Sequence, residues 1–117
     1  MTVTAEDILT EAINILSEPG AWQQKSYCNG TAPLLPDALS ESTAFCTVGA
    51  IAEARRRLNY GGSLLSPNDA WSAFNRALFL SGYTQSAVTW NDDSRRQQSE
   101  VVAMMEKAKA YAAEYKY

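Results

Sequence analysis

The residues best suited to chemistry are two cysteines and an acidic turn, and the chain contains no histidine. Without histidine there can be no Ser-His or Cys-His nucleophilic catalysis, no histidine general acid–base chemistry and no histidine-ligated zinc. The polar, acidic start of the sequence lacks the features of a signal peptide. We therefore interpret Cys28 and Cys46 as free thiols in a reducing cytoplasm.

One combination of residues could still form a reactive site. A helix N-terminus lowers the pKa of a thiol, and two neighbouring carboxylates can bind a metal or share a proton. Cys46, Asp92 and Asp93 could meet in this way. The residues that could line such a pocket are Trp22, Cys46, Trp90, Asn91 and Asp92. The simpler interpretation is packing, because cysteine is often buried and no base is available as its partner. We assign no catalytic residue, metal or cofactor, and the sequence favours a protein that is not an enzyme.

Arginines suggest two further kinds of site. Arg55, Arg56 and Arg57 end an expected helix, where cations complement the helix dipole. Arginine and tyrosine are also typical of the centres of protein interfaces, so Arg56, Arg57 and Tyr60 form our predicted partner-binding patch. Nucleic-acid binding through Arg55–Arg57 with Arg95 and Arg96 is a third alternative. The net charge of −3 argues against it, because nucleic-acid-binding domains usually carry a basic surface.

The elements that must position these residues are helices. Apolar residues recur at helical spacing near residues 5–17, 43–58, 67–80 and 94–113, and no stretch alternates like a strand. The sequence therefore predicts one all-α domain over residues 1–117, with about four principal helices. Residues 20–39 are expected to form a long irregular loop, because Pro33 and Pro36 prevent a regular element there.

Local signals place the helix ends. Thr4 and Asp7 have capping-box spacing, and Ser66-Pro67 is a typical helix start. Ser42 or Thr43 is expected to cap the helix over residues 43–58. Gly49 within that helix predicts a close crossing by another helix, because glycine weakens a helix unless close packing requires it.

Several short motifs together resemble a family of small, uncharacterised bacterial and bacteriophage proteins. They are Trp22, the C-x-x-G-A helix Cys46-Thr47-Val48-Gly49-Ala50 with Ala54, and the turn Trp90-Asn91-Asp92 before a final helix with Val102 and Ala108. The resemblance implies an all-helical domain in a phage or prophage setting, and it implies no reaction or cofactor. The W-N-D turn has a structural interpretation, in which Asn91 or Asp92 caps the last helix and Trp90 packs beside it.

The function that these features favour is a small cytoplasmic, phage- or prophage-encoded accessory protein that acts as a protein-interaction module, with a host factor as a possible partner. The alternatives are a small-ligand or metal-binding protein or enzyme using Cys46, Asp92 and Asp93, and a nucleic-acid-binding protein. No apolar run is long enough for a membrane span, so we expect no membrane partner. The oligomeric state cannot be read from the sequence.

Overall fold

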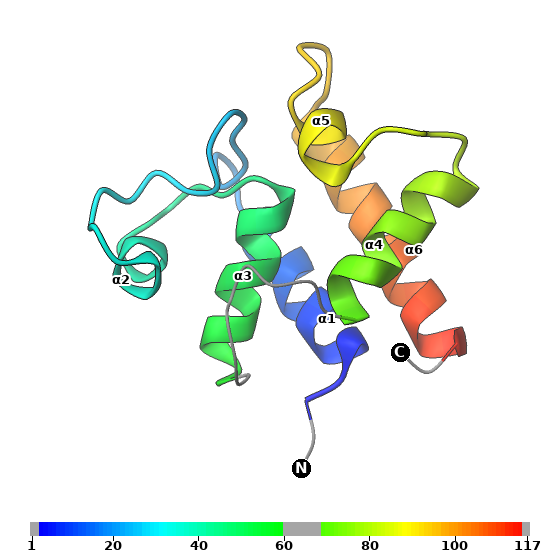
Figure 1. The fold of residues 1–117 in the computed structure, drawn as a ribbon, viewed down its shortest axis with the longest axis horizontal. Coiled ribbons are helices and arrows are strands. Elements are labelled where there is room, and N and C mark those ends of the chain that lie inside the picture. The colour runs from blue at the N-terminus through cyan, green and yellow to red at the C-terminus, as the bar shows by residue number, and fades with distance from the viewer. Residues whose placement is uncertain (1–2, 60–68, 116–117) are drawn as a thin grey trace.

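Helices form all the regular structure in residues 3–59 and 69–115, which are the residues that the computed structural model describes. Their bounds are α1 Ala5–Leu16, α2 Leu35–Ser40, α3 Thr47–Arg57, α4 Asp69–Leu80, α5 Ala87–Asn91 and α6 Gln98–Tyr115 (Figure 1). Four of these have seven residues or more, and the described residues contain no strand. The predicted all-α fold with four principal helices is therefore confirmed.

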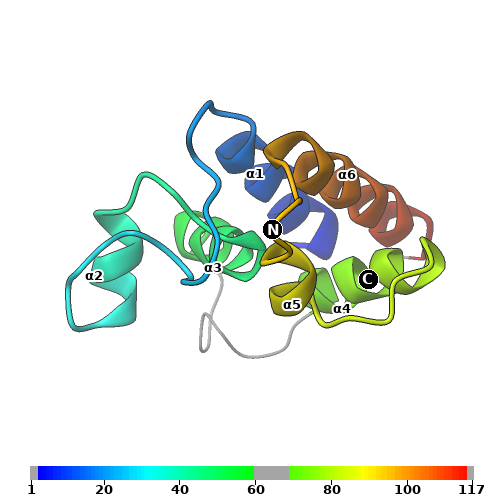
Figure 2. The same ribbon diagram turned by 90° about the horizontal axis from the view of Figure 1, so that it is seen from above.

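The first and last helices pack along each other. α1 contacts α6 most extensively, and it also contacts α3 and α4 (Figures 1 and 2). Its apolar stripe, which includes Ile8, Leu9 and Leu16, is buried in this core. The Thr4–Asp7 capping box is present and fixes the start of α1 as predicted. The helix expected over residues 5–17 thus agrees with α1 to within one residue at its C-terminal end.

α3 begins later than the sequence suggests. The expected start near residue 43, with Ser42 or Thr43 as its cap, is wrong, because Cys46 occupies the N-cap position of α3. The preceding Phe45 is extended and forms isolated bridges with Trp22 and Cys28. Residues 21–28, called the strap from here on, therefore hold this segment out of the helix. From Thr47 to Arg55 every residue of α3 is buried.

Gly49 lies at a close approach, but its neighbour is the strap and not another helix. A Cβ atom built on Gly49 would lie 1.8 Å from the carbonyl oxygen of Tyr27 and 2.7 Å from its carbonyl carbon. The predicted helix crossing is therefore wrong. The glycine is required because the backbone of the strap lies directly on the first turn of α3.

The long connection between α1 and α3 contains one short helix that the sequence did not predict. Pro36 occupies the first turn of α2, where a missing backbone N–H costs nothing. The expectation that prolines exclude a regular element was therefore wrong at this position. α2 packs against α3 and buries Ala38 and Leu39.

The W-N-D turn does not start the last helix. Trp90 and Asn91 end the five-residue helix α5, and α6 begins only at Gln98. The predicted helix near 94–113 is thus present but shifted towards the C-terminus, and neither Asn91 nor Asp92 caps it. α4 ends at Leu80, before Gly82 with φ 92°, as expected. The expected cap of α4, Ser66-Pro67, lies outside the described residues.

Candidate functional site

Asn91 is the centre of the hydrogen-bond network that joins the strap, α3 and α5. Its Oδ1 atom accepts hydrogen bonds from Trp22 Nε1 at 2.7 Å, from the Thr47 backbone N–H at 3.0 Å and from Thr47 Oγ1 at 2.7 Å. Its Nδ2 donates to the Gln23 carbonyl at 3.1 Å. Asn91 and Thr47 are completely buried, so these bonds replace water for the polar side-chain atoms of both residues.

The same turn fastens the strap at two further points. The side-chain amide of Gln24 donates to the carbonyls of Asn91 and Asp93, at 3.0 and 2.6 Å. The backbone N–H of Lys25 donates to Asp92 Oδ1 at 2.9 Å. Lys25 adopts a left-handed conformation with φ 75°, which is uncommon for a residue other than glycine. The bond from Lys25 to Asp92 helps to hold this conformation.

Cys46 is held under the strap in its thiol form. Its backbone N–H donates to the Tyr27 carbonyl at 3.1 Å, and its Sγ atom accepts from the Gly49 backbone N–H at 3.3 Å. Burial raises the pKa of the Cys46 thiol, and the N–H groups of Gly49 and Val48 oppose that shift without reversing it. The position at a helix N-terminus therefore does not produce a reactive thiolate. Both cysteines are free, and Cys28 is half-buried.

Cys46 and Asp92, two of the five residues that the pocket hypothesis named, line one cavity. The cavity has a volume of about 380 Å³, and its lining residues are Lys25, Ser26, Tyr27, Cys46, Val88 and Asp92. Trp22 and Asn91 are hydrogen-bonded to each other and are absent from the lining. Asp93 is absent from the lining; its carboxylate accepts from the Arg95 backbone N–H, which lowers the pKa of Asp93. We call this hollow the Cys46–Asp92 cavity.

Trp90 belongs to an aromatic cluster and not to the cavity. Its ring makes edge contacts with Phe74 and Tyr83, at centroid distances of 5.8 and 5.9 Å. The guanidinium of Arg96 lies 4.1 Å from the centroid of the Trp90 ring, and Arg96 Nε donates to the Trp90 carbonyl. This cation–π contact was missed, because nothing in the sequence separates Arg96 from its neighbour Arg95, which is exposed.

The arginines at the end of α3 bind an acid of their own helix. Arg56 and Arg57 both pair with the buried carboxylate of Glu53, at 2.6 and 2.9 Å, and Arg57 also pairs with Glu11 at 3.3 Å. The hydrogen bond from Arg56 to Glu53 raises the pKa of Arg56. Arg55 is buried. Tyr60, the third residue of the predicted patch, lies outside the described residues.

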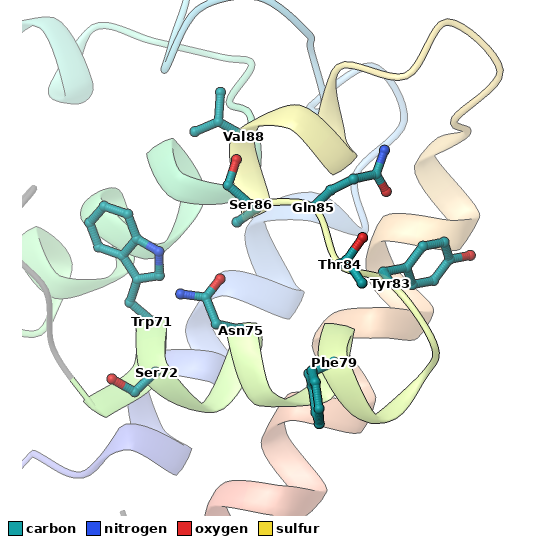
Figure 3. A pocket seen from close by; sticks show the side chains of 10 residues that line it. Trp71, Ser72, Asn75, Phe79, Tyr83, Thr84, Gln85, Ser86 and Val88 are labelled. Carbon is teal, nitrogen blue, oxygen red and sulfur yellow. The ribbon is translucent and has the colours of Figure 1, made fainter.

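A second hollow, which the sequence did not suggest, lies between α4 and α5. It has a volume of about 490 Å³ and is lined by Trp71, Ser72, Asn75, Phe79, Tyr83, Thr84, Gln85, Ser86, Ala87 and Val88. In Figure 3 Trp71 faces Val88 across the hollow, and Asn75 points towards Ser86. We call it the α4–α5 groove. The available signal was Trp71 in α4, but helical spacing alone assigned it to the core.

The part of the chain that the structure describes contains neither a cluster of metal ligands nor a membrane-spanning helix. Within residues 3–59 and 69–115, no three acidic or cysteine side chains are grouped so that they could hold a metal ion. Over the same residues no helix is both long and apolar enough to cross a membrane.

No curated protein and no solved structure matches the chain. One family model matches residues 1–111, which is nearly the whole sequence, and it describes a family of unknown function, DUF6197. Because this match covers nearly the whole sequence, this all-helical chain belongs to the DUF6197 family.

Proposed function

We propose that this protein is a protein-interaction module that binds an uncharged, apolar segment of a partner protein in the α4–α5 groove. The observation that carries the proposal is a concentration of exposed apolar side chains at this place. Phe79 and Val88, which line the groove, are 63% and 40% exposed, and Leu80, which follows Phe79 in α4 but is not part of the lining, is 62% exposed. These are half of the exposed large apolar side chains among the described residues. Exposed apolar surface beside a hollow is typical of a binding site.

The lining of the groove suggests the chemistry of the partner. None of its described lining residues is charged, and the polar ones are hydroxyl and amide side chains. Such groups can hydrogen-bond a peptide backbone, while Trp71 and Val88 can enclose an apolar side chain. A charged segment would lose its hydration here and find no counter-charge in the described lining, of which Arg76, 5.9 Å from the centroid of the Phe79 ring, is not a part. An uncharged peptide with an aromatic or aliphatic anchor fits best.

The predicted patch at Arg56 and Arg57 is the second candidate surface. Both side chains keep partial exposure, 34% and 43%, although both also pair with Glu53. Because Glu53 already holds these two arginine side chains in place, they lose less conformational entropy when they contact a partner, which favours a role in partner binding. A phage or prophage setting, a bacterial cytoplasm and a host factor as partner belong to the same proposal. The phage or prophage setting and the host factor rest on the motif resemblance described above, and the cytoplasm rests on the interpretation of both cysteines as free thiols.

The test is selection from a display library of random short peptides, followed by affinity measurement. We expect enriched peptides to be uncharged at their centre and to carry an aromatic or leucine anchor. The double variant Phe79→Ser/Leu80→Ser should weaken their binding about tenfold, or about 1.4 kcal/mol, as measured by fluorescence anisotropy. The double variant Arg56→Ala/Arg57→Ala measures the contribution of the second surface in the same assay.

The matched control is Leu34→Ser/Tyr115→Ser. These two side chains are 65% and 59% exposed, so the control removes similar apolar surface away from the groove. It should bind the peptides like the parent. Circular dichroism should show that all variants remain folded. If the groove variant and the control bind equally well, the groove is not the contact surface.

A further inference from the structure

The Cys46–Asp92 cavity is lined by two residues of opposite charge whose side chains do not form an ion pair with each other. Lys25 and Asp92 both line it, yet no ion pair joins their side chains. Lys25 is an exposed residue of the strap, and its ammonium has no ion-pair partner among the described residues. Asp92 uses Oδ1 for the Lys25 backbone N–H and for Asn91 Nδ2, at 2.9 and 3.1 Å. Its Oδ2 makes no hydrogen bond to a described residue.

The other residues that line the cavity carry no charge that could pair with a ligand. Cys46 Sγ accepts from Gly49, and Ser26 Oγ donates to the Cys28 carbonyl. The Thr47 backbone N–H at the start of α3 donates to Asn91 Oδ1, so it is not available to a ligand. Val88 and Tyr27 complete the lining. The ionic contacts of any ligand must therefore come from Lys25 and Asp92.

This distribution disfavours three simple ligand classes. A plain anion would meet the carboxylate of Asp92, and the N–H of Thr47 cannot help to bind it. A metal ion would have only two candidate side-chain ligands in the described lining of the cavity, Asp92 and the thiol of Cys46. Covalent attachment to Cys46 is disfavoured because burial raises the pKa of the thiol and keeps it protonated.

We propose that the Cys46–Asp92 cavity binds a small zwitterion, such as a free α-amino acid. Its carboxylate pairs with the ammonium of Lys25, and its ammonium pairs with the open Oδ2 of Asp92. Its side chain lies against Val88, Tyr27 and the thiol of Cys46. The volume of about 380 Å³ is near the lower end for small-molecule sites, which suits a ligand of this size. The cavity shares only Val88 with the lining of the α4–α5 groove, and neither charged residue belongs to the groove.

The probes are the free L-amino acids, each compared with its N-acetyl and its carboxamide derivative. A ligand that binds only the folded state raises the melting temperature, so a thermal-shift screen selects candidates for calorimetry. We expect at least one amino acid to bind. Blocking either of its ends should weaken binding at least about tenfold, because each charge has one partner. If no amino acid binds, or if blocked derivatives bind as well, the proposal is wrong.

Two variants test the assigned partners. Lys25→Gln and Asp92→Asn each remove one charge, and the amide oxygen that Asp92→Asn introduces can still accept the Lys25 backbone N–H. Without ligand, both variants should therefore have the melting temperature of the parent. Their affinity for the amino acid should be at least about tenfold lower. Asp93→Asn is the control, since Asp93 lies outside the cavity, and it should bind like the parent. Unchanged binding by Lys25→Gln and Asp92→Asn would overturn the proposal. Neither substitution changes a residue of the α4–α5 groove, so peptide binding there is measured independently.

Discussion

Asn91 joins three segments because an amide can accept and donate at the same time. Its oxygen accepts from Trp22 and Thr47, and its nitrogen donates to the strap. An aspartate would accept equally well but could not donate to the Gln23 carbonyl, and a leucine could do neither. The requirement for asparagine at this position is therefore explained by hydrogen bonding inside the protein.

We predict that Asn91→Ala will lower the free energy of unfolding by about 2–4 kcal/mol. The substitution leaves Trp22 Nε1 and both donors of Thr47 without an acceptor in a buried site. Chemical denaturation measures the effect. Asn75→Ala, at an exposed position of α4, is the control and should stay within about 0.5 kcal/mol of the parent. Equal stability of the two variants would contradict the role given to Asn91.

For the thiols we predict slow modification of Cys46 and faster modification of Cys28 in the native protein. Cys46 is buried and its pKa is raised, whereas Cys28 is only half-buried. Mass spectrometry of each cysteine-containing peptide during iodoacetamide treatment gives both rates. Faster modification of Cys46 would contradict the structure and restore the hypothesis of a reactive site.

Cys46 also predicts how stability depends on pH. Because its pKa in the folded state lies above the ordinary value of 9.0, the unfolded chain releases this proton first as the pH rises. The contribution of the protonated Cys46 thiol to the free energy of unfolding is therefore complete below pH 9.0. It is lost as the pH rises through the pKa of the folded state. The free energy of unfolding of the parent should fall more steeply above that pH than that of Cys46→Ala. Parallel curves would contradict this.

At the scale of the elements, the strap determines where α3 starts and which residue its first turn can carry. Tyr27 lies so close to Gly49 that even a methyl group would contact its carbonyl. Replacing a glycine inside a helix with alanine normally gains about 1 kcal/mol. At Gly49 this gain in helix stability is opposed by the free energy needed to displace the strap.

Gly49→Ala should therefore destabilise the protein, by about 1–3 kcal/mol. Hydrogen exchange should show the loss first in the strap and its partner segment, where the N–H groups of Gln23 and Cys46 donate to the carbonyls of Phe45 and Tyr27. Ser99→Ala, an exposed position in α6, serves as the control and should change neither stability nor exchange. If Gly49→Ala is as stable as the parent, the strap is not packed as the structure shows.

The four long helices were predictable because each buries a periodic apolar face, and α1 also carries its own cap. The boundaries that were mispredicted all involve partners distant in sequence. Ser42 and Thr43 are good caps locally, but the bridges of Phe45 to the strap override them. Asn91 resembles a cap for the same local reason, yet its oxygen already accepts from Trp22 and Thr47. Local preference cannot reveal contacts of this kind.

The candidate site was only partly predictable. Cys46 and Asp92 line one cavity, but the reasoning that joined them expected Asp92 at the N-terminus of the last helix, whereas Asp92 is the C-cap of α5. Sequence reasoning could not find Lys25, since a lone lysine in a loop has no distinguishing pattern. Nor could it find the α4–α5 groove, because whether Trp71 and Phe79 are core or surface depends on which neighbouring helix covers α4.

Across the whole molecule the arginines serve internal contacts. Arg56 and Arg57 pair with Glu53, and Arg96 stacks on Trp90 with its side chain largely buried. The few arginines that remain exposed belong to a protein whose net charge is −3. The described surface therefore lacks the concentration of available cations on which nucleic-acid affinity depends.

We accordingly predict no measurable binding of single- or double-stranded oligonucleotides at physiological salt. Fluorescence anisotropy with labelled oligonucleotides is the measurement, repeated at low salt, where any residual attraction should be weak. Tight binding that falls steeply as salt increases would identify several phosphate contacts and revive the nucleic-acid alternative.

The pairing of α1 with α6 has a consequence for biosynthesis. The ribosome makes α1 before α6, so the part of the α1 apolar stripe that α6 covers stays exposed until residues 98–115 have left the exit tunnel. Partly made chains with such a stripe attract chaperones and are prone to aggregate. A chain that stops before α6 can form helices but cannot close its core, and proteases should remove it. Only a chain that includes both helices can close this core, so folding has to wait until synthesis has passed α6.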